Sequence, residues 1–532
     1  MQQTQLSLLR ERRGASRPLL QPLARCEWKD PVPLVEYGRG RHCAAASRAR
    51  TGIPEEHRSL LGGLRTLGRC GVGNIGSGPN RGREKKGFKT AFEAEIFSEI
   101  EKLIGPGTVA SCDLEAVETA ARRKALEVAA RVIEQRFNAD TADYAGPVLP
   151  CTCGQQARYV DRRSKTFQTV LGDLNLERAY YHCGSCEKGF YPRDRALGLE
   201  GSSLSPAVLR MVGQVGAVVS FEEGHELLHE LAALDVSAKQ IERYAEGLGR
   251  EIADDEQNLV ESELPSAPTM YLGIDGTGVP VRKQELAARP GKQPDGSAKT
   301  REVKLVTVWS AETRDEQGQP MRDPGSITYS AAIESAATLD TDSDPAEFVA
   351  RVIREARRRG FDQASRRVVL GDGALWIWNL ADEHFPDATQ IVDLYHAKGH
   401  LWDVGKAIYG AGSDLAERWA KQRRDELDDG KLDDILAALA LHVKTNEEAR
   451  RCFDYVTRNC HRMRYPEFRA QGLCVGSGVV EAGCKTAIGV RCKRAGMHWT
   501  VAGADAIIAL RCCKLSGRFE DFWERRAVAT HR

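Results

Sequence analysis

The stretch Thr269-Met-Tyr-Leu-Gly-Ile-Asp275-Gly-Thr-Gly278 decides how this 532-residue chain is interpreted. Its apolar run predicts a buried strand, and the acid followed by glycine marks the point where we expect the strand to end. A second stretch, Arg367-Val-Val-Leu370 followed by Gly371-Asp372-Gly373, has the same pattern 97 residues after the first acid. Two acids at the ends of buried strands are a first indication of a cation site.

Further segments place both acids in one α/β domain. Strands are predicted at 303–309, 326–329 and 390–393, and a helix is predicted between 344 and 360. Three strands that suit antiparallel pairing, followed by helix, strand, helix and strand, are the order of an RNase H-like fold. In that order the first and fourth strands are neighbours, so we expect Asp275 and Asp372 to meet.

A third acid comes from Val475-Gly-Ser-Gly-Val-Val-Glu481-Ala-Gly-Cys-Lys485. The Gly-Ser-Gly run is predicted to open a helix over the same strands, with Glu481 in its first turn. Carboxylates are the hard oxygen ligands that Mg²⁺ prefers, so Asp275, Asp372 and Glu481 predict a site for two Mg²⁺ or Mn²⁺ ions. Each acid alone is equally well explained as a turn or cap residue. The order of the three elements favours a site for metal-dependent phosphoryl transfer.

Four of the fifteen cysteines are spaced as metal ligands. Cys151-Thr-Cys153 and Cys183-Gly-Ser-Cys186 bracket the strand-like residues 154–182. Two such knuckles joined by a hairpin bring four thiolates to the ~2.3 Å that tetrahedral Zn²⁺ requires, which predicts a structural zinc ribbon. Because the first pair is C-x-C rather than C-x-x-C, four unpaired thiols in a β-rich region are the alternative.

Residues 221–231 are predicted to form one helix, and a second helix is predicted to begin near residue 237. Ser237-Ala-Lys-Gln240 has the pattern of a capping box that opens the second helix. The pair fits a DNA-reading helix-turn-helix, with Lys239, Gln240 and Arg243 near its recognition end. An ordinary helical hairpin is the alternative.

The net charge of +1 conceals an uneven distribution. Residues 1–90 carry 18 Lys and Arg against 7 Asp and Glu, and residues 482–518 carry seven basic residues against a single acid. Binding to a phosphate backbone depends on such local patches rather than on the total charge. A solvated basic face is the alternative for the second patch. Its candidate DNA-contacting residues are Lys485, Arg491, Lys493, Arg494 and Trp499.

These segments predict a multidomain protein. No run reaches the roughly eighteen apolar residues of a membrane span, and no secretory signal is recognisable, so we expect a cytoplasmic protein without membrane contact. The predicted order is a disordered or spurious basic extension (1–87), a helical region (88–147), the zinc ribbon (148–198), a helix-turn-helix-like region (199–262), and a catalytic domain (265–400 and 471–525) interrupted by an all-helical insertion (401–470).

From about Phe88 to Trp523 the motifs resemble those of the ISKra-type bacterial insertion-sequence transposases, whereas residues 1–87 match nothing in that family. The stretches that carry the resemblance are Tyr271-Leu-Gly-Ile-Asp-Gly-Thr-Gly-Val-Pro280, Lys292-Gln-Pro-Asp-Gly-Ser-Ala-Lys-Thr-Arg-Glu-Val-Lys304, Gly371-Asp-Gly-Ala-Leu-Trp-Ile-Trp378, Asp393-Leu-Tyr-His-Ala397 and Gly478-Val-Val-Glu-Ala-Gly-Cys-Lys485. The resemblance implies an RNase H-like DDE domain with a helical insertion, whose acids are Asp275, Asp372 and Glu481.

Asp393-x-x-His396 resembles the D-x-x-H signature of Mutator-like and related DDE transposases, which implies that Asp393 and His396 lie near the active site. A strand-end Asp and a helix-cap His are the alternative.

The resemblance also implies a function. The expected enzyme is a bacterial, nucleoid-associated homodimer that binds the terminal inverted repeats of its element and target DNA, and cleaves and transfers DNA strands. It would need two catalytic Mg²⁺ or Mn²⁺ ions and one structural Zn²⁺. A zinc-containing DNA-binding protein without catalysis, or a decayed transposase, is the main alternative. An RNase H-like nuclease without end specificity is a third.

Overall fold

The structure is a computed structural model that describes residues 113–258, 267–286, 296–337, 345–476 and 478–530, with the isolated residues 94, 97, 98, 101, 102 and 293. The predicted extension at 1–87 lies outside the described residues, as do Ser477 and most of residues 88–112 in the predicted helical region. By its contacts the chain divides into Met1–Arg81 and Gly82–Arg532. All elements described below belong to the second unit.

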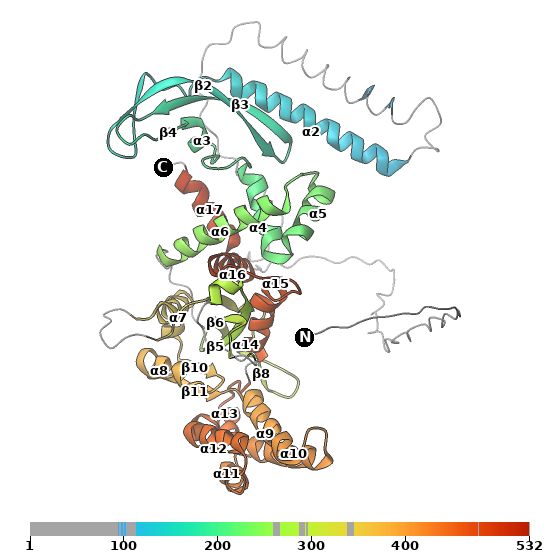
Figure 1. The fold of residues 1–532 in the computed structure, drawn as a ribbon, viewed down its shortest axis with the longest axis vertical. Coiled ribbons are helices and arrows are strands. Elements are labelled where there is room, and N and C mark those ends of the chain that lie inside the picture. The colour runs from blue at the N-terminus through green and yellow to red at the C-terminus, as the bar shows by residue number, and fades with distance from the viewer. Residues whose placement is uncertain are drawn as a thin grey trace, which may run out of the picture. The chain divides into compact units, whose positions relative to one another are not determined.

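The first described elements are a long helix and an antiparallel sheet (Figure 1). The elements are α2 (Leu114–Ala139), β1 (Val148–Pro150), β2 (Gln156–Thr169), β3 (Gly172–His182), β4 (Gly189–Phe190) and α3 (Pro192–Ala196). The strand order is β1-β2-β3-β4. Asp113 caps α2, because its carboxylate accepts hydrogen bonds from the N–H groups of Glu115 and Ala116. The helix contacts the sheet at β3, where the Asn138 side-chain amide donates a hydrogen bond to the carbonyl of Asn175 at 2.8 Å.

Three helices follow: α4 (Pro206–Val218), α5 (Phe221–Ala232) and α6 (Ala238–Asn258). The predicted capping box before α6 is confirmed. The Ser237 N–H donates to the Gln240 side-chain oxygen at 3.1 Å, and the Gln240 N–H donates to the Ser237 hydroxyl at 3.4 Å. The short break between α5 and α6 therefore has the position that the sequence indicates.

The central sheet has five strands in the order β11-β10-β5-β6-β9. Along the chain they are β5 (Thr269–Pro280), β6 (Thr300–Ser310), β9 (Thr328–Ala332), β10 (Arg366–Gly371) and β11 (Thr389–Val392). Pairing is antiparallel for β5 with β6 and for β6 with β9, and parallel for β10 with both β5 and β11. The first and fourth strands are thus neighbours, as expected. Between the strands lie η2 (Lys283–Leu286), the hairpin β7 (Thr313–Arg314) and β8 (Pro320–Met321), α7 (Glu347–Arg358), η3 (Phe361–Gln363) and α8 (Leu375–His384).

One detail of the prediction is wrong: β5 does not end at Asp275. It continues to Pro280 because β6 goes on pairing with it, up to Thr300 opposite Pro280. Only the pairing with β10 stops earlier, since its last pair is Gly273 with Leu370.

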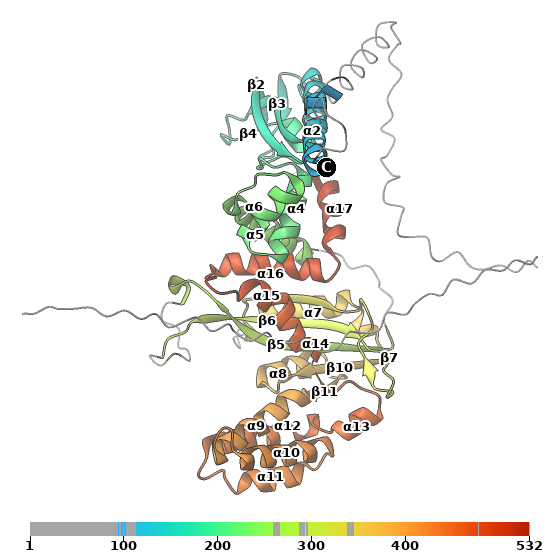
Figure 2. The ribbon, with the colours of Figure 1, turned by 90° about the vertical axis from the view of Figure 1, so that its right-hand side faces the viewer.

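The helical insertion predicted at 401–470 begins earlier in the structure, at Leu394, and its regular elements are all helices. It comprises α9 (Leu394–Tyr409), α10 (Asp414–Asp428), α11 (Leu432–Ala440), α12 (Glu447–Asn459), η4 (Cys460–Arg462) and α13 (Tyr465–Ala470). The chain then returns to the sheet, where the Cys474 N–H donates to the Tyr271 hydroxyl at 3.1 Å. The last elements are α14 (Gly478–Gly483), the π-helical segment η5 (Cys484–Gly489), α15 (Val490–Cys492), α16 (Val501–Leu515) and α17 (Phe519–Thr530). Figure 2 shows α14 beside β5.

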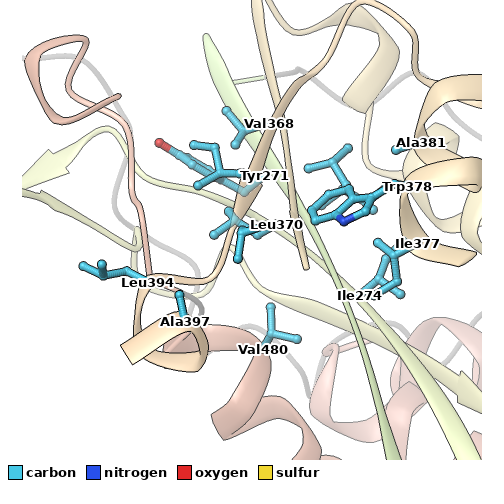
Figure 3. Close-up of a cluster of buried hydrophobic side chains, with 14 of the residues drawn as sticks. Tyr271, Ile274, Val368, Leu370, Ile377, Trp378, Ala381, Leu394, Ala397 and Val480 are labelled. Atoms are coloured by element: carbon cyan, nitrogen blue, oxygen red, sulfur yellow. The ribbon is translucent and has the colours of Figure 1, made fainter. Parts of the chain in front are cut away.

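One hydrophobic core joins these parts around the end of the sheet. Figure 3 shows Leu394 and Ala397 of α9 and Val480 of α14 in the same cluster as Ile274 of β5 and Leu370 of β10. The segments that precede each candidate catalytic residue are therefore packed against one another. None of the described helices is both long and apolar enough to cross a membrane.

Candidate active site and metal centre

Three aspartates stand in one row just beyond the point where the parallel pairing of β5, β10 and β11 ends. Asp275 and Asp372 each lie two residues beyond the last pair of β5 with β10. Asp393 lies one residue beyond the last pair of β11 with β10, and the same register places it beside Asp372. The Asp393 N–H continues the ladder, because it donates to the Gly371 carbonyl at 2.8 Å. Neighbouring strands are about 4.8 Å apart, so carboxylates of one row can share a ligand.

A cleft of about 280 Å³ opens at this row. All five residues predicted for catalysis line it: Asp275, Asp372, Asp393, His396 and Glu481. The cleft is bounded by the sheet, by the first turns of α9 and by α14. Segments that are far apart in the sequence thus contribute acids and imidazoles to one cavity.

Asp275 lies in a crowded electrostatic environment. Burial raises its pKa, and the neighbouring Asp372 carboxylate raises it as well, although hydrogen bonds from the Cys484 thiol and the Gly276 N–H act in the opposite direction. The Asp372 carboxylate is oriented by its own turn, because it accepts a hydrogen bond from the Ala374 N–H at 2.8 Å. Two carboxylates crowded in a partly buried site provide hard oxygen ligands whose repulsion a divalent cation would relieve.

Glu481 is positioned by close packing of α14 on β5. A Cβ atom added at Gly273 would lie 2.1 Å from Cγ2 of Val480, so only glycine lets the helix approach this closely. Glu481 itself is exposed, and its carboxylate accepts a hydrogen bond from Nζ of Lys485 at 2.9 Å. It lies at the cleft but turns toward the lysine.

The acids consequently do not form a closed ligand set in this conformation. Within the described ranges, the only group of three or more His, Cys, Asp or Glu residues whose ligand atoms all lie within 4.8 Å of one another is the set of four cysteines. A three-acid site would require the Glu481 side chain to leave Lys485 and rotate toward the aspartates.

Asp393 and His396 combine both interpretations of their motif. Asp393 directly follows the last residue of β11, as the strand-end alternative suggested. The helix cap is this aspartate rather than His396, because Asp393 is the N-cap of α9 and its carboxylate accepts a hydrogen bond from the His396 N–H at 2.5 Å. Both residues nevertheless line the cleft. The cap therefore fixes the start of the helix whose side chains form one wall of the site.

The remaining residues of that wall were missed by the sequence analysis. They are Tyr395, Gly399, His400 and Asp403. The His396 and His400 rings are 4.9 Å apart. Burial lowers the pKa of His400, and the charge of His396 lowers it further. The spacing His396-x-x-x-His400-x-x-Asp403 on a helix starting at Leu394 is the signal that would have identified this face.

The four predicted cysteines converge at the knuckles of the first sheet. The Sγ atoms of Cys151 and Cys186 are 3.6 Å apart, and those of Cys153 and Cys183 are 3.7 Å apart. A tetrahedron of sulfurs at ~2.3 Å from a zinc ion has edges of about 3.8 Å. Hydrogen bonds from the N–H groups of Cys186 and Ser185 lower the pKa of the Cys183 thiol to about 6. This donor set fits a tetrahedral metal ion.

Two candidate DNA contacts are wrong for this conformation, because they are buried. Arg491 is 0% exposed: its Nε donates to the Gly216 carbonyl at 3.0 Å, and its guanidinium lies over the rings of Phe221 and Trp499. Burial lowers its pKa to about 10. Trp499 is 7% exposed and donates from its indole nitrogen to the Cys492 carbonyl. Arg491 thus joins α15 to α4 and α5, and the Trp499 ring packs edge-on against the Phe221 ring of α5, with 6.0 Å between the ring centroids.

The other three candidate DNA contacts of the second patch, Lys485, Lys493 and Arg494, are exposed, whereas Arg511 is buried and Lys514 and Arg518 are half-buried. Lys493 donates to the Thr277 hydroxyl on β5, two residues beyond Asp275. Arg494 forms an ion pair with Glu223 of α5, in which one N–O distance is 2.6 Å. These two side chains, with Lys485, extend from the cleft toward α5.

The three candidates of the helix-turn-helix lie at the start of α6. Lys239 is exposed and pairs with Glu242 at 2.9 Å, and Arg243 is exposed with its guanidinium over the Tyr244 ring. Gln240 is half-buried, and its side-chain oxygen is engaged in the capping box. Lys239 and Arg243 therefore remain accessible to a ligand, whereas Gln240 first has a structural role.

No family model matches the chain. The chain is similar to a curated protein described as "UPF0236 protein in vanSb 3'region" from Streptococcus gallolyticus, with 23% identity over 381 residues, 70% of this chain and 76% of that protein. Among solved structures it is similar to a chain of the Drosophila P element transposase strand transfer complex, with 10% identity over 62% of this chain and 83% of the other. The TM-score of that pair is 0.22, which is too low to indicate a shared fold.

Proposed function

We propose that this protein is a DDE-type transposase related to the ISKra type, with an RNase H-like catalytic domain. One observation carries the proposal: Asp275 and Asp372 stand in the same row of a parallel strand pair, and Glu481 lies at the same cleft. Strand order, all-helical insertion and the position of the third acid on a covering helix agree with this assignment.

The aspartates and Glu481 have separate roles in this proposal. Asp275 and Asp372 would hold divalent cations, whose chemistry is to activate an attacking water or 3′-hydroxyl and to stabilise the leaving oxygen. Glu481 would complete the ligand set after leaving Lys485, and the freed ammonium group of Lys485 could then meet a DNA phosphate. Asp393 keeps α9 in place, so that His396 faces the reacting phosphate.

Two further parts of the proposal concern binding. The cysteines Cys151, Cys153, Cys183 and Cys186 would hold one structural Zn²⁺. Double-stranded terminal-repeat DNA would lie along the start of α6 and the exposed residues Lys485, Lys493 and Arg494, with two copies of the chain at paired ends. The N-terminal ends of recognition helices read base edges, and scattered lysines and arginines neutralise phosphates.

The Glu481–Lys485 ion pair favours a second candidate, a zinc-containing DNA-binding protein without catalysis. The two candidates differ in a cleavage assay on terminal-repeat DNA with Mg²⁺. If the protein is a transposase, the wild type nicks the ends and Asp372→Ala binds DNA without cutting. Asp425→Ala, at an exposed position on α10, is the matched control and should cut normally. A wild type that binds the ends but never cuts them supports the second candidate, and equal cleavage by Asp372→Ala removes the assigned site.

A further inference from the structure

Two tyrosines of the helical insertion reach the strand ends that carry the aspartates. The Tyr455 hydroxyl, from α12, donates to the backbone carbonyl of Asp372 at 2.9 Å. The Tyr465 hydroxyl, from the start of α13, donates to the carbonyl of Val392 at 3.1 Å, and Val392 directly precedes Asp393. The insertion thus makes a directed hydrogen bond at each of two neighbouring strand ends.

These bonds are placed where strand pairing runs out. At its last residues a strand has few remaining partners for its carbonyls, and a buried carbonyl without a donor costs free energy. Tyr465 is 0% exposed and Tyr455 is partly buried, so water has little access to either bond. A phenol is well suited to this task, because its rigid ring extends from the insertion helix to the sheet and ends in a donor.

Close packing makes the contact of Tyr455 specific. Gly373 has a φ of +99°, and a Cβ atom there would lie 2.3 Å from the Tyr455 ring. On the insertion side, the ring of His400 lies 4.5 Å from that of Tyr455. The turn after Asp372 is therefore held between a ring from α12 and its own strand, with the Asp372 carboxylate directed by the Ala374 N–H.

We propose that Tyr455 and Tyr465 are positioning residues, through which the helical insertion holds Asp372 and Asp393 in the row that faces the cleft. The inference rests on the proposed function for its effect on catalysis. The two tyrosine hydrogen bonds, called the clamp below, are a property of the metal-free protein. The clamp gives the insertion a role in building the site.

The test uses Tyr455→Phe and Tyr465→Phe in the full chain, since each removes only a hydroxyl. Tyr409→Phe, on α9 of the same insertion, is the matched control. The first readout is amide hydrogen exchange of the metal-free protein in a peptide covering 371–378. In Tyr455→Phe we expect exchange about five- to tenfold faster, the effect of losing one buried hydrogen bond, and no change in Tyr409→Phe. In Tyr465→Phe we expect the faster exchange in the peptide that includes Asp393.

The second readout is the Mg²⁺ concentration that gives half-maximal cleavage. It should rise in both variants while the affinity for DNA stays the same, because the site is loosened and the DNA surface is not. Exchange in Tyr455→Phe that equals that of wild type and of Tyr409→Phe overturns the clamp. An unchanged Mg²⁺ requirement in an active protein overturns its catalytic role. If the wild type does not cleave at all, the proposed function fails, and the exchange measurement still decides the clamp.

Discussion

Substitution of Gly273 by alanine tests how closely α14 must approach the sheet. The new methyl group would lie 2.1 Å from Cγ2 of Val480, whereas van der Waals contact between two carbons needs about 3.5 Å. The methyl group would also lie 2.9 Å from the side chains of Thr307 and Trp309, so a small shift of β5 within the sheet cannot relieve the overlap. The helix therefore has to move outward by about 1.4 Å at Val480.

This displacement acts on the next residue, Glu481. A misplacement of about 1 Å at a catalytic group can lower a rate by roughly a hundredfold, and overpacking of a core costs about 1–3 kcal/mol of stability. We expect Gly273→Ala to lower the cleavage rate roughly a hundredfold, while the protein stays folded and binds terminal-repeat DNA.

The measurements are single-turnover cleavage and urea unfolding of Gly273→Ala, Val480→Ala and the double variant. Val480→Ala removes the methyl groups that collide, so the double variant should recover part of the rate lost by Gly273→Ala. Recovery stays partial because Thr307 and Trp309 are still in the way. Cleavage by Gly273→Ala within threefold of wild type, or purely additive effects in the double variant, would show that the contact between Gly273 and Val480 does not position Glu481.

Three further predictions concern the metal, the pH dependence and the basic patch. Cys183→Ser should lower bound zinc, measured by atomic absorption, from one per chain to near zero; unchanged zinc content contradicts the site. The guanidinium of Arg494 lowers the pKa of Glu223 to about 2, below its ordinary value, so the stability from this pair is present above pH 4.5 and is lost as the pH falls toward 2. Glu223→Gln should therefore flatten the loss of stability in urea titrations between pH 4.5 and 2, and an unchanged slope argues against the pair. Lys485→Ala should lower the salt dependence of DNA binding by about one in slope, whereas Arg491→Met should lower stability and leave that slope unchanged. If Arg491→Met instead lowers the salt slope and leaves stability unchanged, Arg491 contacts DNA.

Much of the central sheet was predictable, because local patterns specify its parts. Apolar runs mark the strands, and the capping box at Ser237 and the knuckle spacing of the cysteines depend on residues close together in sequence. The order of elements was enough to make Asp275 and Asp372 neighbours. Their shared row follows from the register, which the sequence alone did not provide.

The features that were missed depend on contacts between distant segments. β5 continues past Asp275 because of pairing with β6, a partner that the acid–glycine pattern does not reveal. Arg491 looked like a surface charge, but Phe221 and the Gly216 carbonyl provide a buried environment for it. Nothing in the local sequence marks Tyr455, because its bond to the Asp372 carbonyl joins positions 83 apart in the chain.

In the proposed site, Asp275, Asp372 and Glu481 bind divalent ions together. The most direct measurement is calorimetric titration of Mn²⁺ into the zinc-loaded protein on cleaved terminal-repeat DNA, compared with Asp275→Asn and Asp372→Asn. We expect two Mn²⁺ ions per wild-type active site and at least one fewer in each variant. Equal Mn²⁺ stoichiometry and affinity in all three proteins would contradict it.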